Sequence, residues 1–302
     1  NGCLPIAYYK NSGAAADLSS PNSQGHCALN PVSFEEKKYE IKEAAVKKKI
    51  AVIGGGIGGM EVARLCSMMG HTVDLYEKTD QLGGVFIAAA APDFKEKDKE
   101  LIEWYKTQIK KLPITLHMNT EITSLSEIQA DEIVVATGAA PRKLPIPGFE
   151  KGIEAIDYLL GKKEVGTKVA VIGGGLTGCE IAYDLAKKGK EPFVVEMTED
   201  LIKALGICAA NSSCLRDLLR YYKVPVYLES TLKEIQDHNV VILTPDGEKV
   251  IDCDSVVLSV GYVPGTSLVK ESSEHVHILG DAAKVGNLKN VIWGAYDLAF
   301  SL

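Results

Sequence analysis

Short apolar runs alternate with helix-like patterns along most of the chain. The run IAVI (50–53) is rich in β-branched residues, which is typical of a strand buried in a parallel sheet. A glycine-rich turn follows, and apolar residues then recur at helical spacing in MEVARLCSMM (60–69). The next apolar run, TVDLYE (72–77), predicts a second strand. This order of strand, glycine turn, helix and strand predicts an α/β fold.

Three further elements are predicted outside this unit. Residues 94–111 predict an amphipathic helix, and HVHIL (275–279) predicts a short strand. A final apolar helix is expected to begin near Asn290, Val291 and Ile292, with Asn290 as its N-cap. The apolar face expected for the first of these helices comprises Phe94, Leu101, Ile102, Tyr105 and Ile109.

The strand–turn–helix–strand unit occurs twice. Residues 166–197 align without a gap on residues 47–78, at an offset of 119 positions. Further on, DSVVLSVGYVPG (254–265) loosely matches DEIVVATGAAPR (131–142). The sequence therefore predicts two copies of one domain plan.

Each copy carries the pattern G-x-G-x-x-G between its first strand and its helix. The first glycine permits a tight turn, the second lets a pyrophosphate approach backbone N–H groups, and the third lets helix and strand pack closely. An acidic residue at the end of the second strand is suited to binding ribose hydroxyls. The candidate residues are Gly54, Gly56, Gly59 and Glu77 in the first copy, and Gly173, Gly175, Gly178 and Glu196 in the second.

Two nucleotide sites in one chain indicate two cofactors, a fixed flavin dinucleotide and a diffusible nicotinamide dinucleotide. A 2′-phosphate at the second site would meet the carboxylate of Glu196, and neither Met197 nor Thr198 is basic. We therefore expect NADH rather than NADPH. The alternative is a pair of glycine-rich turns without any ligand.

Composition narrows the class of protein. The 302 residues include 33 Lys plus Arg against 40 Asp plus Glu, and this net charge of −7 disfavours nucleic acid as a partner. No apolar run is long enough for a membrane span. Seven cysteines spread over such a length suit a reducing, cytoplasmic compartment. Because the chain begins with Asn1, we expect a fragment or a processed chain.

With these two glycine patterns and their glutamates, the sequence resembles the two-dinucleotide flavoproteins of the glutathione and thioredoxin reductase superfamily. The resemblance implies two Rossmann-like dinucleotide-binding domains, with the second inserted into the first. FAD would bind at the first G-x-G-x-x-G pattern, or fingerprint, and the nicotinamide nucleotide would bind at the second. The expected division is 46–148 plus 264–302 for FAD and 149–263 for NAD(P)H. Residues that the resemblance adds are Gly83, Gly84, Thr137, Gly138, Gly261, Asp281 on the FAD ribityl chain, and Ile292 near the flavin at the start of the last helix.

Asp281 and the last helix each have a plainer interpretation. Asp281 could be an ordinary turn residue, and the helix could simply pack on the domain. If its N-terminus does face the flavin, its N–H groups would favour negative charge at the N1–C2=O edge.

The cysteines do not suggest a redox-active pair. Cys66 and Cys179 fall on the fingerprint helices, and nothing places Cys208 and Cys214 at the flavin. We expect these four and Cys253 to be structural thiols, so that dithiol–disulfide exchange is not the chemistry.

The first 45 residues differ from the rest. Residues 11–25 read as an irregular loop and residues 34–48 as an exposed, charge-rich connector. NGCL (1–4) and CALNP (27–31) resemble the iron–sulfur segment of the 2-enoate reductase and 2,4-dienoyl-coenzyme A reductase branch of the old yellow enzyme family. Cys3 and Cys27 match its third and fourth cluster ligands, although the stretch between them is longer than usual. Two thiolates cannot complete a cluster normally held by four.

The resemblance to this branch implies a larger parent protein. Its N-terminal part would be a TIM barrel with FMN, and a 4Fe–4S cluster would carry electrons from FAD to FMN. The present chain would be the electron-input half. Two alternatives stay open: an ADP-binding scaffold similar to that of trimethylamine dehydrogenase, and a free-standing NADH:acceptor oxidoreductase.

Overall fold

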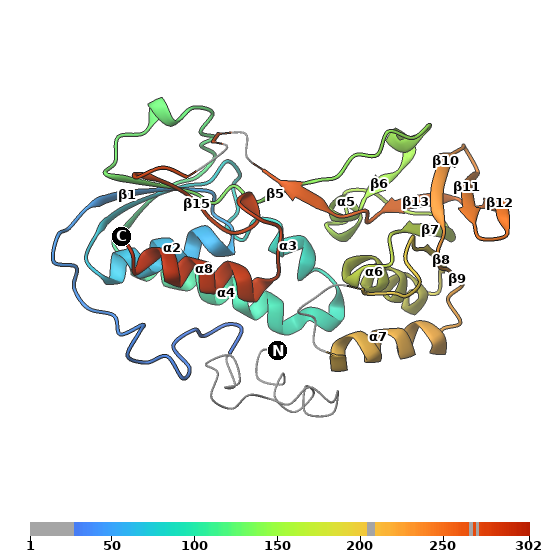
Figure 1. The fold of residues 1–302 in the computed structure, drawn as a ribbon, viewed down its shortest axis with the longest axis horizontal. Coiled ribbons are helices and arrows are strands. Elements are labelled where there is room, and N and C mark those ends of the chain that lie inside the picture. The colour runs from blue at the N-terminus through green and yellow to red at the C-terminus, as the bar shows by residue number, and fades with distance from the viewer. Residues whose placement is uncertain (1–26, 204–208, 266–267, 270–271) are drawn as a thin grey trace. The chain divides into compact units, whose positions relative to one another are not determined.

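A computed structural model describes residues 27–203, 209–265, 268–269 and 272–302, which form two compact units. Unit 1 comprises residues up to 87, 96–140 and 263–302, and unit 2 comprises residues 88–95 and 141–262. The chain passes between them through β5 (Ala139–Pro141) and β14 (Tyr262–Pro264), which pair as a two-stranded sheet (Figure 1). Cys3 and the predicted loop 11–25 lie outside the described residues.

Unit 1 is built on a five-stranded parallel sheet in the order β15-β4-β1-β2-β3. Read from β3, this is the strand order 3-2-1-4 of a Rossmann fold with one further strand. Figure 1 shows three helices, α2, α4 and α8, running beside one another along this sheet. The strands are β1 (Lys49–Ile53), β2 (Thr72–Tyr76), β3 (Ile114–His117), β4 (Glu132–Val135) and β15 (Val276–Ile278). The helices are α2 (Ile57–Met68), α3 (Phe86–Ala89), α4 (Glu96–Lys111) and α8 (Leu288–Ala299), with 3₁₀ turns η4 (Leu125–Glu127) and η6 (Gly280–Ala282).

The core of unit 1 explains why these residues form these elements. Ile50 and Val52 point to the helical face of β1 and are fully buried there, while Ala51 and Ile53 are buried on the other face. A strand that is buried on both faces has no polar positions, hence the continuous run IAVI. Helix α2 is also buried along nearly its whole length, because it lies between the sheet and the other two helices.

Unit 2 repeats this plan with a second parallel sheet, ordered β6-β13-β7-β8-β9. One face of this sheet packs on α6 and α7, and the other packs on the antiparallel sheet β10-β11-β12. Its parallel strands are β6 (Ile153–Glu154), β7 (Lys168–Ile172), β8 (Glu191–Val195), β9 (Val226–Tyr227) and β13 (Ser255–Leu258). The other elements are η3 (Asp93–Lys95), η5 (Phe149–Lys151), α5 (Ala155–Leu159), α6 (Leu176–Lys187), α7 (Ala209–Tyr221), β10 (Thr231–Ile235), β11 (Asn239–Thr244) and β12 (Gly247–Asp252).

The prediction of an exposed connector at 34–48 is wrong for Tyr39. This side chain is 1% exposed and packs edge-on against Tyr296 and Phe300 of the α8 region. Its hydroxyl donates a 2.6 Å hydrogen bond to Oδ1 of Asp297, which Lys38 also contacts at 2.7 Å. Tyr39 therefore anchors the connector to unit 1. The charged residues on either side of Tyr39 made the whole segment look exposed in the sequence.

The helix predicted at 94–111 is observed as α4, which begins at Glu96, two residues after the predicted start. Ile102, Tyr105 and Ile109 are buried as expected, but Phe94 lies outside the helix in η3. Its ring instead packs against Tyr183 of α6, with 5.1 Å between the ring centroids. None of the helices in the described residues is long and apolar enough to cross a bilayer.

Candidate functional site

The first glycine loop connects β1 to α2, and two of its predicted glycines are required by close backbone contacts. Gly54 has φ +112°, and a Cβ there would lie 2.4 Å from the carbonyl oxygen of Ala136 on the neighbouring strand end. A Cβ on Gly59 would lie 1.8 Å from the carbonyl oxygen of Gly54. Any larger residue at either position would force the turn apart.

Gly56 differs from these two glycines because the space that a side chain would occupy there is empty. A Cβ there would meet nothing within 4 Å, and the backbone has φ −72°, which any residue adopts. Gly56 is the N-cap of α2, makes no side-chain capping bond, and is followed by no acidic residue in the first turn. The N–H groups that begin the helix therefore face open space, an arrangement that suits a pyrophosphate.

The second glycine loop, between β7 and α6, has the same construction. Gly173 has φ +102°, and its Cβ would lie 2.2 Å from the carbonyl oxygen of Ser259. A Cβ on Gly178 would lie 1.9 Å from the carbonyl oxygen of Gly173, whereas one on Gly175 would meet nothing within 4 Å. The described residues thus contain two cradles of the same shape, one in each unit.

The two acidic residues sit directly behind these loops. Oε2 of Glu77 accepts a hydrogen bond of 2.8 Å from the N–H of Gly55, and Oε2 of Glu196 accepts one of 2.6 Å from the N–H of Gly174. Both side chains are buried, at 7% and 9% exposure. A carboxylate oxygen accepts about two hydrogen bonds, so each Oε2 retains capacity for a hydroxyl.

Two threonines complete these networks and were missed by the sequence analysis. Thr79 donates to Oε1 of Glu77 from both its N–H, at 2.9 Å, and its hydroxyl, at 2.8 Å. Thr198 does the same to Oε1 of Glu196, at 2.8 and 2.9 Å. The signal was present in the sequence, because the pattern E-x-T recurs at the offset of 119 positions.

The loops that follow distinguish the two sites. In the first, Gly83 forms a parallel bridge with Gly56, and a Cβ on Gly84 would lie 3.1 Å from the Cα of Gly56. The positions 119 residues later are Ile202, which has φ +52°, and Lys203. In the first copy, the backbone of Gly83 and Gly84 therefore packs directly on the backbone of Gly56. In the second copy, the corresponding residues Ile202 and Lys203 carry side chains.

The strand ends beside each loop carry a glycine with positive φ and open surroundings. Gly138 has φ +76° and Gly261 has φ +89°, and a Cβ on either would meet nothing within 4 Å. The hydroxyl of Thr137 donates a 2.9 Å hydrogen bond to the carbonyl oxygen of Gly265, whose N–H in turn donates to Gly138. The side chain of Thr137 thus binds the segment at Gly265, where the chain re-enters unit 1.

Asp281 lies in η6 and is partly buried. Its Oδ1 accepts a 3.0 Å hydrogen bond from the N–H of Gly286, and burial raises the pKa of its carboxyl. The second carboxylate oxygen has no partner among the described residues that would compete with a ligand hydroxyl.

The predicted start of the last helix is wrong. Helix α8 begins at Leu288, and its N-cap is Asn287, which exchanges hydrogen bonds of 3.1 Å with Asn290 in a reciprocal cap. Ile292 therefore lies in the second turn, where its N–H is engaged within the helix, and its side chain is fully buried. The first-turn N–H groups without such a partner belong to Leu288 and Lys289.

Of the five cysteines expected to be structural thiols, three are buried, and Cys208 lies outside the described residues. Cys66 and Cys179 are fully buried, and burial raises the pKa of each thiol to about 12. Cys253 is also buried, and burial raises its pKa to about 11. The expectation of a structural thiol is wrong for Cys214, which lies exposed on α7.

Of the two candidate cluster ligands, the structure describes Cys27 alone. It is partly buried, and its carbonyl oxygen accepts a 3.0 Å hydrogen bond from Nε1 of Trp293 on α8. No group of three or more metal-binding side chains occurs among the described residues. A single thiol does not complete a cluster that is normally held by four thiolates.

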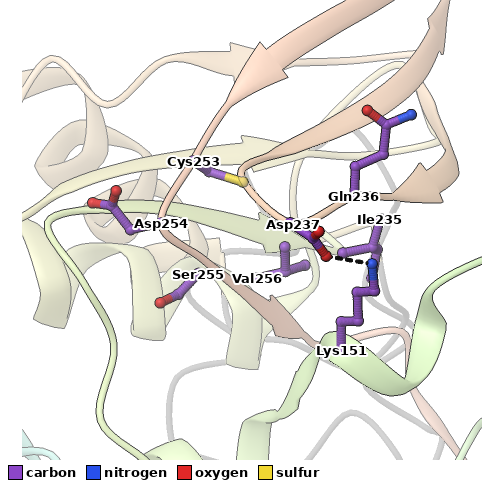
Figure 2. A pocket seen from close by; sticks show the side chains of 8 residues that line it. All are labelled: Lys151, Ile235, Gln236, Asp237, Cys253, Asp254, Ser255 and Val256. Carbon is purple, nitrogen blue, oxygen red and sulfur yellow. Dashed lines mark hydrogen bonds and ion pairs between the residues drawn. The ribbon is translucent and has the colours of Figure 1, made fainter.

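A separate hollow of about 300 Å³ lies in unit 2, beside the antiparallel sheet (Figure 2). Lys151 and Asp237 form an ion pair of 2.6 Å at its wall. None of the predicted site residues lines it. The lining residues are Lys151, Ile235, Gln236, Asp237, Cys253, Asp254, Ser255 and Val256.

Comparison with known proteins agrees with this geometry. The model of the pyridine nucleotide-disulphide oxidoreductase family matches residues 18–127 and 123–281. The chain belongs to this family. The predicted fold class, two Rossmann-like dinucleotide-binding domains with one inserted in the other, is thereby confirmed.

The chain is similar to two curated relatives and to one solved structure of known name. It is 39% identical over 279 residues to the cinnamate reductase of Clostridium sporogenes, which covers 90% of this chain and 42% of that protein. It is 30% identical over 306 residues to the NADH oxidase of Thermoanaerobacter brockii, covering 97% and 47%. The structure of 2-naphthoyl-CoA reductase matches with a TM-score of 0.86 and 32% identity, covering 93% of this chain and 44% of that one. The chain thus spans less than half the length of these relatives.

Proposed function

We propose that this chain is the electron-input half of a larger reductase, with FAD on unit 1 and NADH on unit 2. The observation that carries the proposal is the pair of open glycine loops, each backed by a buried glutamate that retains hydrogen-bonding capacity. When bound, the two cofactors supply hydride transfer from nicotinamide to flavin.

The residues of unit 1 would hold FAD along its length. The N–H groups after Gly56 take the pyrophosphate, and Glu77 takes the adenosine ribose. Asp281 takes a ribityl hydroxyl. Gly83 and Gly84, already closed on Gly56, keep water from the pyrophosphate, which suits a cofactor that stays bound.

The last helix would favour reduction of the flavin through its N-terminus. The free N–H groups of Leu288 and Lys289, rather than that of Ile292, are the donors available to a developing negative charge. Lys289 adds a positive side chain at this end of the helix. Binding, orientation and electrostatics are then the contributions of the protein, and no acid–base residue is required.

The residues of unit 2 favour NADH over NADPH. Glu196 would accept a hydrogen bond from the 2′-hydroxyl of the ribose through Oε2 and would repel a 2′-phosphate. The residues that follow it, Met197 and Thr198, provide no positive charge, and Thr198 is already bound to Glu196. Gly175 and Gly261 leave room for the pyrophosphate.

The relatives support a longer parent protein. Cinnamate reductase and 2-naphthoyl-CoA reductase are reductases more than twice as long as the matched segment. We propose that the remainder supplies the FMN-binding TIM barrel of the branch, and that Cys3 and Cys27 belong to its 4Fe–4S segment in a cytoplasmic enzyme. The substrate would then be reduced outside the present chain.

The proposal is tested by identifying and titrating the bound nucleotide. The purified chain is expected to release FAD on denaturation, and NADH added without oxygen is expected to bleach the flavin absorbance faster than NADPH does. Release of ADP without flavin would favour the scaffold alternative. Retention of FAD without bleaching by either nucleotide would contradict the proposed electron input.

A further inference from the structure

The segment after β8, residues 198–203, supports the second glycine loop from behind. The N–H of Ile202 donates a 2.8 Å hydrogen bond to the carbonyl oxygen of Gly174. A Cβ on Gly174 would lie 2.6 Å from Cδ2 of Leu201, so the two segments are packed without spare room. Movement of this segment would therefore move the glycine loop and the N–H that binds Glu196.

This segment contains a strained residue that the first copy avoids. Ile202 has φ +52°, a left-handed conformation that costs a residue with a Cβ about 1–2 kcal/mol. At the corresponding position the first copy has Gly83, which adopts positive φ freely and closes directly on Gly56. The second copy keeps the hydrogen bond and the leucine contact to its glycine loop, but the described residues contain no bridge at Gly175 like that between Gly56 and Gly83.

Arg216 of α7 also contacts this segment. Its Nη2 donates to Oδ2 of Asp200 at 2.9 Å and its Nε lies 3.3 Å from Oδ1 of the same carboxylate, in a two-pronged arrangement. Nη2 also donates to the carbonyl oxygen of Leu201. Arg216 is partly buried, with 26% of its side chain exposed, whereas the side chain of Asp200 is 57% exposed, so solvent screens part of this ion pair. The position in the first copy that corresponds to Asp200 is the uncharged Gln81.

We propose that Arg216 is a positioning residue for the nicotinamide nucleotide, an inference that rests on the function proposed above for unit 2. By clasping Asp200 and Leu201 it fixes segment 198–203, and this segment holds Gly174 and Glu196 in the arrangement that ribose and pyrophosphate require. The hydrogen bonds of Arg216 are made to Asp200 and Leu201 of the protein itself. At the first site, Gly83 and Gly84 hold the corresponding segment against Gly56 through the backbone. At the second site, the side chain of Arg216 holds the segment instead.

The test compares Arg216→Ala with Arg220→Ala in the FAD-loaded chain. Arg220 lies one turn further along α7 and pairs only locally, at 2.6 Å, with the exposed Asp217, so it is a matched control for loss of one arginine. Arg216→Ala is expected to raise the Kd of NADH about tenfold, which corresponds to about 1.4 kcal/mol, and to raise KM while leaving kcat within about twofold. Arg220→Ala is expected to match the wild type, and both variants are expected to retain full FAD content.

A charge exchange separates positioning from general loss of stability. Asp200→Arg and Arg216→Asp are each expected to weaken NADH binding, and the double variant is expected to recover part of the affinity because the ion pair is restored in reverse. Tighter binding in the double variant than in either single variant supports the proposal even if Arg216→Ala folds poorly.

The outcomes distinguish the two levels of the argument. If the wild type binds NADH and Arg216→Ala binds it equally well, Arg216 is not a positioning residue and the proposed function stands. If the wild type retains FAD and binds no nicotinamide nucleotide, the assignment of unit 2 fails and the role of Arg216 fails with it. A double variant no better than the singles also overturns the proposal.

Discussion

The carboxylate of Glu196 accepts a 2.6 Å hydrogen bond from the main-chain N–H of Gly174, and Glu77 accepts the same bond from Gly55 in the other unit. Each acid thereby joins the end of one strand to the glycine loop of another. This relationship makes the two glutamates separable probes of the two sites.

Replacing Glu196 with Ala is expected to weaken NADH binding about tenfold and to leave FAD content unchanged, because a hydrogen bond from ribose to a charged acceptor is worth about 1.5–3 kcal/mol. Isothermal titration with NADH and quantification of released flavin provide the two measurements. Glu191→Ala, at the exposed start of the same strand, is the control. Loss of flavin with NADH affinity intact would reverse the assignment of the sites.

Valine at Gly56 or Gly175 is expected to block ligands without damaging the fold. Both positions have ordinary φ values and no neighbour within 4 Å of the added Cβ, so the melting temperature of the ligand-free protein should change little. Gly56→Val is expected to lose FAD, whereas Gly175→Val should retain FAD and lose NADH-dependent flavin reduction.

Alanine at Gly59 or Gly178 should behave in the opposite way. The added Cβ would lie 1.8 or 1.9 Å from a carbonyl oxygen, so unfolding is expected at lower temperature or denaturant concentration even without ligand. Thermal unfolding of all four variants makes the comparison. Equal destabilisation of the valine and alanine variants would show that the open space at Gly56 and Gly175 is already filled.

Tyr39→Phe is expected to destabilise unit 1 by about 1–2 kcal/mol, because the substitution removes the hydroxyl that donates a hydrogen bond to Asp297. Urea unfolding measures the change. Lys38→Ala is the comparison, since the ammonium of Lys38 is more than half exposed and its loss should matter less. A larger effect from Lys38→Ala would place the anchor in the ion pair instead.

Asp297 should make this anchor sensitive to acid. Burial raises the pKa of Asp297, but hydrogen bonds from Lys38 and Tyr39 outweigh it and lower the pKa below the usual value near 3.8. Because the folded-state pKa is the lower one, the stabilisation is present above about pH 4 and is lost as the pH falls towards the folded-state value. Unfolding free energies of wild type and Asp297→Asn are therefore expected to converge in acid, and a constant difference would contradict the direction of the shift.

Thiol labelling should follow burial. At pH 8 an alkylating reagent is expected to modify Cys214 and to spare Cys66 and Cys179, whose thiols burial holds at a pKa of about 12. Peptide mass mapping of the native protein reads out each site. Rapid modification of Cys66 or Cys179 would reopen the possibility of thiol chemistry at the fingerprint helices.

The local features of the fold were predictable because they depend on neighbouring residues. A buried strand, a turn that demands glycine at Gly54 and a helix that follows all leave their mark within a dozen positions, and the offset of 119 residues doubled the signal. The pattern E-x-T was equally local, and aligning the copies one residue further would have found Thr79 and Thr198.

The features that were missed depend on distant partners. Tyr39 reads as part of a charged connector because the aromatic residues that bury it lie more than 250 positions later. Phe94 packs on Tyr183 of α6 rather than on its own helix. The start of α8 was misplaced for a different reason, since Asn287 and Asn290 are both good caps and only their reciprocal bonding shows which one begins the helix.

The threonines beside Glu77 and Glu196 have a thermodynamic consequence. A free glutamate would have to surrender its rotamer freedom when a sugar arrives, and that ordering entropy would be subtracted from the affinity. Here each carboxylate is immobilised by its own chain before any ligand is present. The protein has therefore met this entropic cost during folding, and a ribose that binds as proposed would encounter an acceptor that is already preorganised.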